Sequence, residues 1–552
     1  MGQYLNPGNT AYEEAVNSQI FIDKSEIILF LNSITRTNQK YVSVSRPRRF
    51  GKTMAADMVC AYYDRSVDNR ELFGKLKLAS ADQAEKKAEW DKYLGKFDVI
   101  RIVMTKFFNG KSSADESLDK MQRIISREII KAYPDVDYFD ESDLIQTIDD
   151  AYSDNENQVV FVIDEWDAVF RECKEDKEGQ IHYLDFLRDM LKDKDYIALA
   201  YMTGILPIKK YGKHSALNMF TEYSMTYPKQ FAPYTGFTVE EVRNLCNKYG
   251  MDYHEVENWY DGYEVSDIIP IDKREEYRQG KYEGHKVSIY SPLSVVEAMV
   301  NGEIKNYWNK TESYEALAEY IKKDYDGLKE VVTLLMDGAR VTVDTATYQN
   351  DMTTFTCRDD VLSLLIHLGY LGYDDGTSEV YIPNREILEE FKASTKGTEW
   401  VDSFKSFEIS QELLSATLER NATKVAELLE QAHDRAGNKT YNDEAALSYA
   451  IQYAYYAAQK YYTTILELDT GKGYADIVYI PSPKHPEKPA MVIELKYNKD
   501  AETALSQIKK QNYPSRLEHY KGNILLVGID YDKDVSNTSG EFKRHKCVIE
   551  MA

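Results

Sequence analysis

The sequence predicts a multidomain α/β protein, and three observations lead to this fold class. The chain has 552 residues, more than one hydrophobic core usually organises, so we expect about three domains. Near the N-terminus, a strand pattern, a Gly-Lys-Thr loop and a helical pattern follow one another. Near the C-terminus, helical and strand patterns alternate in the order αβββαβ. The expected domains span residues 1–234, 235–400 and 401–552.

The first informative stretch is SVSRPRRFGKTMAADMV, residues 43–59. The β-branched, alternating run at 39–46 predicts a strand, and apolar spacing predicts a helix over 51–64. A strand, a loop ending in Gly-Lys-Thr and a helix form the context of a P-loop, in which backbone N–H groups and the helix N-terminus face phosphates. Lys52 would then reach the β- and γ-phosphate oxygens, and the Thr53 hydroxyl would bind Mg²⁺.

The loop departs from the pattern G-x-x-x-x-G-K-[ST], because Arg46 occupies the position of the first glycine. Pro47 stiffens the turn, and Arg48 or Arg49 can place positive charge near a phosphate or near a neighbouring subunit of a homo-oligomer. One of these two arginines can act as an arginine finger; the alternative is that both pair with surface carboxylates. The predicted contacts to ATP in this loop are Arg46, Pro47, Arg48, Arg49, Phe50, Gly51, Lys52, Thr53 and Met54.

A P-loop needs a partner strand that is buried and ends in acidic residues, and QVVFVIDEWDAVF at 158–170 provides one. Asp164 is expected to hold the Mg²⁺ shell. Glu165 is expected to act as the general base that polarises the attacking water. The alternative is a core strand followed by a solvated acidic turn.

Two more apolar runs, at 97–104 and 195–204, predict further strands of the same sheet. Thr203 ends the second run, at the position where additional-strand ATPases keep a polar residue that senses the γ-phosphate. A hydroxyl that caps the next segment is the alternative. Together these patterns predict an additional-strand P-loop NTPase domain that binds ATP and Mg²⁺.

The middle of the chain, 235–400, is rich in helical spacing and aromatic residues and shows no catalytic cluster. Asp261 and Gly262 predict a structural corner between aromatic residues. The stretch 361–384 predicts an apolar helix followed by a hairpin, a layout that fits a winged-helix-like lid. His367 on that helix is expected to be a core histidine rather than a ligand.

The second informative stretch runs from LELDTGKGYADIVYI to PAMVIELKYN. Asp476 opens one predicted strand, and Glu494 and Lys496 lie two residues apart on the next, so they share a face. If the two strands pair antiparallel, Asp476 converges with them. Two carboxylates and the carbonyl of Leu495 can bind one or two Mg²⁺ ions, while Lys496 orients or helps deprotonate the attacking water. The alternative is a surface salt bridge on an edge strand.

The surroundings of these acids predict an αβββαβ core like that of restriction endonucleases. Helices are expected at 441–459 and 501–513, and strands at 462–468 and 523–529. Glu444 on the first helix is a candidate additional metal ligand, and Glu467 is a weaker one.

Composition and charge exclude several classes of protein. No apolar run approaches the roughly 20 residues that cross a bilayer, and the N-terminus lacks a secretion signal. We therefore expect a cytoplasmic protein with no membrane partner. The net charge of −24 argues against coating nucleic acid with the whole surface, whereas residues 471–552 carry 13 basic and 11 acidic side chains, a balance of +2. The five scattered cysteines form no CxxC and are expected to be reduced: Cys60, Cys173, Cys246, Cys357 and Cys547.

The N-terminal motifs resemble the AAA-ATPase-like family, whose bacterial members are commonly fused to a PD-(D/E)XK nuclease domain. In that family the loop has the sequence R-P-R-R-F-G-K-[ST], so an arginine at the position of Arg46 is usual there. Trp166 and Ala168 stand where the family usually has Tyr and Lys. The stretches that carry the resemblance are 21–31, 45–53, 159–170, 203–208, 216–220, 234–245, 259–265 and 289–296.

The C-terminal spacing D-x(17)-E-x-K resembles the nuclease domain of the same fused family. Tyr474 stands where the family usually has an arginine two residues before the aspartate. Gln507 matches the glutamine of the family helix A-x-x-Q-I, and the resemblance implies that it supports the site. The implied metal is Mg²⁺, with Mn²⁺ as an alternative.

These observations lead to one expected function and two competing ones. The expected protein binds and hydrolyses ATP and is coupled to a Mg²⁺-dependent nuclease that cleaves DNA or RNA. The first alternative is a nucleotide-switched binding or assembly protein whose nuclease-like domain grips a partner without cleavage. The second is an ATPase motor without nuclease chemistry.

Overall fold

The chain forms two compact units in the computed structural model. Unit 1 comprises Met1–Asp326 and Val341–Ala393, and unit 2 comprises Gly327–Arg340 and Ser394–Ala552. The segment Gly327–Arg340 thus belongs with the C-terminal region, while the three domain boundaries expected from the sequence stay a prediction. The structure describes residues 2–80, 89–110, 112–208, 216–282, 284–308, 314–322, 325–346, 355–397, 400–436, 444–469, 474–483, 485–498, 501–510, 517, 520, 522–532 and 544–552.

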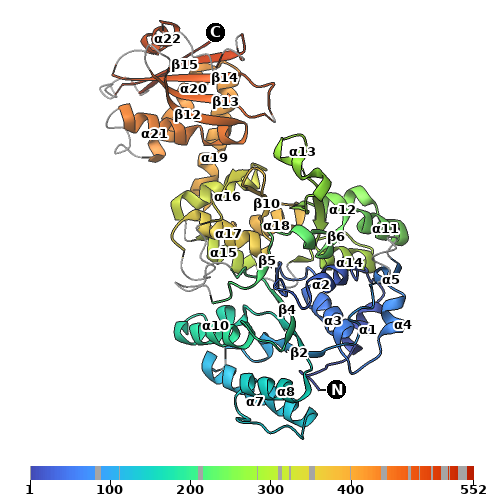
Figure 1. Cartoon of the computed structure of the whole chain (residues 1–552). Coiled ribbons are helices and arrows are strands. Elements are labelled where there is room, and N and C mark those ends of the chain that lie inside the picture. The colour runs from blue at the N-terminus through green and yellow to red at the C-terminus, as the bar shows by residue number, and fades with distance from the viewer. Residues whose placement is uncertain are drawn as a thin grey trace. The chain divides into compact units, whose positions relative to one another are not determined.

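Unit 1 is built around a parallel sheet of five strands (Figure 1). The strands have the spatial order β2-β3-β4-β1-β5, so β4 lies between the strand that leads into the Gly-Lys-Thr loop and the strand that ends in Asp164. This insertion confirms the additional-strand P-loop fold expected from the sequence. The strands are β1 (Tyr41–Ser45), β2 (Asp98–Val103), β3 (Val159–Asp164), β4 (Ile197–Gly204) and β5 (Thr221–Tyr223).

Helix α3 (Lys52–Tyr63) follows the loop directly and packs on the sheet, as its apolar spacing predicts. Its buried face joins β-branched side chains of β1 and β3 in one core cluster. The other helices of this region are α1 (Thr10–Val16), α2 (Ile27–Ile34), α4 (Arg70–Gly74), α5 (Lys77–Ser80), α7 (Ala114–Ala132), α8 (Leu144–Asn155), α9 (Ala168–Glu172) and α10 (Lys177–Leu191), with 3-10 helices η1 (Met104–Lys106) and η2 (Lys229–Tyr234).

The middle of the chain is helical, with two small sheets. The sheets have the orders β6-β8-β7 and β10-β11-β9. Their strands are β6 (Phe237–Thr238), β7 (Tyr263–Ser266), β8 (Lys286–Tyr290), β9 (Val341–Thr342), β10 (Gly372–Asp374) and β11 (Glu379–Tyr381). The helices are α11 (Val239–Tyr249), α12 (Tyr253–Tyr260), α13 (Arg274–Arg278), α14 (Pro292–Asn301), α15 (Tyr314–Lys322), α17 (Arg358–Leu368) and α18 (Arg385–Ser394), with 3-10 helices η3 (Ile271–Lys273) and η5 (Tyr325–Gly327).

The predicted apolar helix and hairpin of the middle region are confirmed as α17 and the antiparallel pair β10–β11. Helix α17 ends at Leu368 because Gly369 takes a left-handed conformation, with φ of +88°. His367 is 4% exposed, and burial followed by the nearby Arg46 charge lowers its pKa to about 3. It is therefore a neutral core histidine, as the sequence predicts. The winged-helix comparison stays a prediction.

Unit 2 contains a mixed sheet with the order β12-β13-β14-β15-β16. Strands β12 to β14 pair antiparallel, β14 and β15 pair parallel, and β15 and β16 pair antiparallel. The strands are β12 (Tyr462–Asp469), β13 (Tyr474–Pro481), β14 (Ala490–Tyr497), β15 (Ile524–Tyr531) and β16 (His545–Met551). The helices are α16 (Leu328–Met336), α19 (Val401–Leu418), α20 (Ala422–Ala436), α21 (Glu444–Ala454) and α22 (Ala501–Lys510), with 3-10 helix η8 (Tyr456–Lys460).

The order α21-β12-β13-β14-α22-β15 confirms the predicted αβββαβ core, to which the structure adds α19, α20 and β16. Alternating side chains of the sheet enter two separate clusters. Ile493 and Leu495 pack in the cluster that includes residues of α19, α20 and α21. Ala490 and Val492 pack in the cluster on the opposite face, with Leu517. No helix among the described residues combines the length and the apolar character that crossing a membrane requires.

Candidate functional site

The Gly-Lys-Thr loop of unit 1 folds around its own lysine. Gly51 has φ of +82° and caps α3, and Arg49 also lies in the left-handed region with φ of +67°. The Nζ atom of Lys52 donates to the carbonyl oxygens of Arg46, at 2.9 Å, and Pro47, at 2.7 Å. Burial lowers the pKa of Lys52 to about 8, against the opposing effect of the carboxylate of Asp167. Phosphate oxygens are acceptors that can replace these two carbonyls.

Arg46 supports the loop from inside the protein. Its side chain is fully buried, and its Nε donates to the Thr235 hydroxyl at 2.7 Å. Its Nη1 donates to the carbonyl oxygens of Ser45 and Tyr223, both at 2.8 Å. Burial lowers the pKa of Arg46 to about 9. These contacts fasten the start of the loop to β5 and to the residue after η2. The expected contact between Arg46 and ATP stays a prediction.

Pro47 and Phe50 hold the loop against the middle region of unit 1. A methyl group at Gly369 would lie 2.8 Å from Cβ of Pro47, so only glycine fits there. The Phe50 ring meets the Tyr263 ring edge-on, with centroids 5.4 Å apart. The loop thus contacts residues that are more than 200 positions away in sequence.

Two cavities meet at the loop. The polar cavity has a volume of about 490 Å³ and is lined by Arg48, Arg49, Gly51, Lys52, Thr53, Met54, Thr105, Glu165, Arg171 and Glu172. The apolar cavity has a volume of about 390 Å³, and its wall includes Tyr12, Phe21, Ile22, Phe50, Phe237 and Leu293. Arg49, Gly51 and Met54 line both cavities. A charged compartment beside an apolar one suits a phosphorylated ligand that carries an aromatic base.

Asp164, at the end of β3, has an oxygen that suits a cation. The side chain is 1% exposed, and the Thr203 hydroxyl donates to its Oδ1 at 2.5 Å. Its Oδ2 is buried and has no hydrogen-bond partner among the described residues. A bare buried carboxylate oxygen costs free energy unless a cation or a water satisfies it. The donor set therefore fits Mg²⁺ or one of its water ligands.

Glu165 and Arg171 face each other across the polar cavity. Glu165 has φ of +55°, an unusual conformation for a side-chain-bearing residue that often marks functional sites. Nη2 of Arg171 lies 3.7 Å from Oε2 of Glu165, and its Nε lies 3.6 Å from Oδ2 of Asp167. Arg171 is 8% exposed, and these two nitrogens have no hydrogen-bond partner among the described residues. A buried guanidinium with spare donors can bind a phosphate oxygen.

The strand register of unit 2 brings the predicted acids together. Ile477 of β13 pairs with Ile493 of β14 in antiparallel register, so the next step along the strands sets Asp476 opposite Glu494. Opposed residues of an antiparallel pair point to the same face. Oδ2 of Asp476 accepts the backbone N–H of Leu495 at 2.7 Å. The antiparallel pairing that the sequence required is therefore present.

Lys496 completes this group from the same face. Its Nζ donates to Oε1 of Glu494 at 3.0 Å and to the carbonyl oxygen of Leu495 at 2.9 Å. The Lys496 and Glu494 side chains are 6% and 2% exposed, and β14 lies between β13 and β15. The pair is therefore neither on the surface nor on an edge strand, which rules out the alternative interpretation of these two residues.

Comparisons with known proteins identify both regions. Residues 8–212 match the family model described as predicted AAA-ATPase, and residues 443–540 match the PD-(D/E)XK nuclease superfamily. The chain carries an AAA-ATPase-like domain and a C-terminal PD-(D/E)XK nuclease domain. No curated protein matches the chain.

Solved structures that are similar to the chain include three archaeal proteins, each 11% identical to it. Cdc6p from Pyrobaculum aerophilum matches with a TM-score of 0.24, covering 67% of this chain and 92% of its own. The Aeropyrum pernix ORC1 protein in complex with DNA matches with a TM-score of 0.25, covering 73% and 100%. The Aeropyrum pernix ORC2 protein, in ADPNP–ADP complexes, matches with a TM-score of 0.20, covering 67% and 92%.

Three predicted residues of the nuclease domain cannot be placed by their side chains. Gln507 belongs to α22, Glu444 is the first residue of α21, and Glu467 belongs to β12, but their side chains lie outside the described residues. Their roles stay predictions. Helix α22 contacts β14 and β15, the strands that carry or adjoin the acids.

Sequence reasoning missed two residues beside the sites. Arg171 lies seven positions after Asp164 on the short helix α9, and an arginine that closely follows an acidic strand end was a usable signal. Asp530 on β15 pairs in parallel register with Lys496 and is fully buried. An aspartate near the end of an apolar strand was the signal there. The lining of the apolar cavity had no signal, because its residues come from distant segments.

Proposed function

We propose that the protein binds and hydrolyses ATP in its AAA-ATPase-like domain and cleaves phosphodiester bonds of DNA or RNA in its nuclease domain. The observation that carries this proposal is the arrangement on β13 and β14, where Asp476 opposes Glu494 and Lys496 follows on the same face of a central strand. A buried acid and a half-buried acid beside a buried lysine fit metal-assisted phosphodiester hydrolysis.

In the ATPase domain, each compartment of the site has a separate task. The apolar cavity takes the base, and the polar cavity takes the phosphates. Lys52 exchanges its two carbonyl acceptors for phosphate oxygens. Thr53 and Asp164 would hold Mg²⁺, which when bound supplies positive charge against the negative phosphate oxygens. The Thr203 hydroxyl holds Asp164 in place.

Glu165 is the proposed base of ATP hydrolysis. It lines the polar cavity beside Thr53 and Lys52, and it accepts the proton of the attacking water. Arg171 lies 3.7 Å from this carboxylate, so it can restrain Glu165 or bind a phosphate oxygen. Arg48 and Arg49 line the same cavity, and they are proposed to contact phosphates or a neighbouring subunit of a homo-oligomer.

In the nuclease domain, Asp476, Glu494 and the carbonyl oxygen of Leu495 would hold Mg²⁺, or Mn²⁺ in its place. Lys496 contacts both Glu494 and that carbonyl, and from this position it orients the attacking water or takes its proton. Gln507 and Glu444 are proposed to support the site.

The second candidate function is a nucleotide-switched binding protein in which the nuclease domain grips a partner without cleavage. The net charge of −24 favours it, because a nuclease that tracks along nucleic acid usually presents a broad basic groove. A cytoplasmic location is proposed for either function.

One experiment separates the two functions. The purified protein is incubated with single- and double-stranded DNA and RNA, with and without ATP and with Mg²⁺ or Mn²⁺. Lys52→Ala and Glu494→Ala variants run beside the parent. The proposal predicts metal-dependent cleavage that Glu494→Ala abolishes and that Lys52→Ala changes in its response to ATP. If the parent cleaves no more nucleic acid than an Asp476→Ala/Glu494→Ala double variant but still binds it in an ATP-dependent way, the result would support the binding function.

A further inference from the structure

A separate group of side chains in unit 2 has the composition of a transition-metal site. Glu430 and His433 lie three residues apart on α20, and His545 is the first residue of β16. One potential ligand atom from each lies within 4.8 Å of the others. All three fall outside residues 443–540, so they flank the matched nuclease domain on both sides. None of them belongs to the group formed by Asp476, Glu494 and Lys496.

The carboxylate of Glu430 fixes the orientation of His545. Nδ1 of His545 lies 2.9 Å from Oε2 of Glu430, and because a carboxylate only accepts, Nδ1 carries the proton. The backbone N–H groups of Arg544 and His545 donate to the same oxygen at 2.9 and 3.2 Å. Three N–H donors therefore converge on one oxygen of Glu430 and hold the carboxylate in place.

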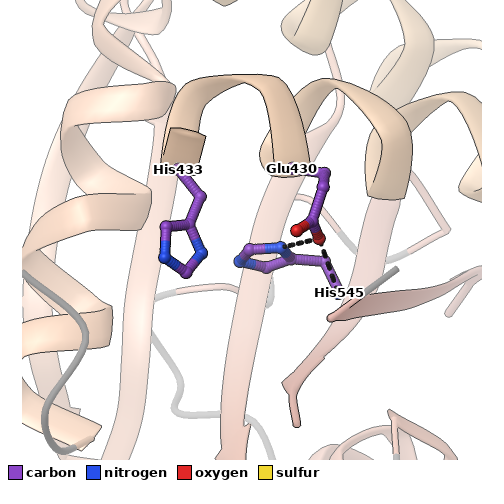
Figure 2. A group of neighbouring side chains, drawn as sticks. All are labelled: Glu430, His433 and His545. Carbon is purple, nitrogen blue, oxygen red and sulfur yellow. Dashed lines mark hydrogen bonds and ion pairs between the residues drawn. The ribbon is translucent and has the colours of Figure 1, made fainter. Parts of the chain in front are cut away.

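With its proton on Nδ1, His545 offers the lone pair of Nε2. Figure 2 shows this nitrogen and Nδ1 of His433 pointing toward one another from opposite elements. The two ring centroids are 5.4 Å apart, and the rings are nearly perpendicular, at 82°. Both histidines are almost fully buried, at 1% and 2% exposure. Two imidazoles that face each other, one of them hydrogen-bonded to a carboxylate, resemble the environment of zinc-binding histidines.

We propose that His433 and His545 bind a transition-metal ion of the Zn²⁺ class, with Glu430 holding His545 through its Nδ1–H. The ion would link α20 to β16, and so connect the segment that precedes the matched nuclease region to the segment that follows it. Imidazole ligands favour Zn²⁺, Co²⁺ or Ni²⁺ over Mg²⁺, which prefers oxygen. The site is therefore chemically distinct from the acids proposed for Mg²⁺ on β13 and β14.

The positive charge of Arg544 opposes metal binding at His433. Nη1 of Arg544 lies 3.4 Å from Nε2 of His433. A metal on Nδ1 of His433 leaves the remaining proton on Nε2, where it faces the donor groups of this guanidinium. Arg544 must then move aside, so removing it should strengthen metal binding. If Glu430, His433 and His545 only fill the interior, removing Arg544 would not create or strengthen metal binding.

The test uses the full chain with Asp476→Asn and Glu494→Gln, which removes the two carboxylates proposed to hold Mg²⁺ on β13 and β14. Co²⁺ is the probe, because its visible absorption reports imidazole ligands directly, and Zn²⁺ and Mg²⁺ are the competitors. We expect one Co²⁺ per chain that Zn²⁺ displaces and Mg²⁺ does not. His433→Asn and His545→Gln should abolish the signal, Glu430→Gln should weaken affinity about 10–100-fold, and Arg544→Gln should strengthen it.

A matched control and a second readout keep the result interpretable. His254→Asn changes a histidine with an 88% exposed side chain and should leave Co²⁺ binding unchanged. Zn²⁺ should raise the melting temperature of the parent but not that of His545→Gln. The proposal is overturned if the parent gives no Co²⁺ signal, or if His433→Asn binds as tightly as the parent. It also fails if Zn²⁺ shifts the melting temperature of the parent and of His545→Gln equally.

Discussion

The two candidate catalytic sites of this chain each contain a buried lysine, and the two lysines are held in different ways. Lys52 lies at the start of a helix and donates to two main-chain carbonyls of its own loop. Lys496 lies on a central strand and donates to a carboxylate and to one carbonyl. The first lysine has partners that a ligand can replace, whereas the second is paired with the acid that we propose as a metal ligand. A loop site therefore has to be reorganised by its substrate, while a sheet site is already assembled.

The comparison predicts the largest effect for the assembled site. Asp476→Asn or Glu494→Gln should lower phosphodiester cleavage by about 10³-fold, because a metal ligand worth several kcal/mol is lost. Cleavage of a labelled oligonucleotide measures the rate. Asp532→Asn, the same kind of exchange at a residue that directly follows β15 and has no proposed role, serves as the matched control. Equal losses in both would contradict the assignment.

The loop site should respond almost as strongly at its lysine. Lys52→Ala removes the donor that phosphate oxygens would recruit and should lower ATP turnover about 10²–10³-fold. Phosphate release measures the rate. Lys75→Ala, which changes an exposed lysine paired with Glu71 one helical turn away, should turn over ATP at the parental rate. Unchanged turnover in Lys52→Ala would separate the loop from ATP hydrolysis.

Arg171 should have an intermediate effect. Arg171→Ala removes a charge-assisted contact worth about 1.5–3 kcal/mol, which corresponds to roughly 10–100-fold. If the guanidinium binds the terminal phosphate, affinity for ATP should fall more than affinity for ADP. Calorimetric titration of both nucleotides tests this difference. Arg188→Ala is the control, because Arg188 pairs with Asp185 and Asp189, neighbouring acids on its own helix α10. An equal loss of affinity for ATP and for ADP would mean that Arg171 does not bind the terminal phosphate and acts by restraining Glu165.

The smallest effect concerns pH and distinguishes the two lysines. Lys52 has a pKa of about 8, so it loses its charge as the pH rises through that value. ATP affinity should therefore decrease above about pH 8, by at most tenfold per pH unit. Lys52→Arg should remove this decrease, because arginine stays charged. The sign for stability is opposite: between pH 8 and 10.5 the unfolded chain binds more protons at this residue, so the free energy of unfolding should rise. A flat affinity profile in the parent would contradict the lowered pKa.

The sheet site was the more predictable of the two. The two-residue spacing of Glu494 and Lys496 fixes their common face in any strand, and antiparallel pairing then suffices to bring in Asp476. The P-loop was recognisable from local order, as was the strand ending in Asp164. Its side-chain partners were not, because Thr235 and Gly369 contact the loop from positions far along the chain. No local pattern distinguishes an arginine that reaches a phosphate from one that turns inward.

The buried contacts of Arg46 couple the position of the loop to other parts of unit 1. Any displacement of the loop's first residue must stretch or break its bonds to Tyr223 and Thr235. Pro47, one position further on, abuts Gly369 at the end of α17. The loop is thus in direct contact with the end of α17, a helix that is far away in sequence. Substitutions at Thr235 or Gly369, which line neither cavity, should consequently behave in genetic screens like lesions of the nucleotide site itself.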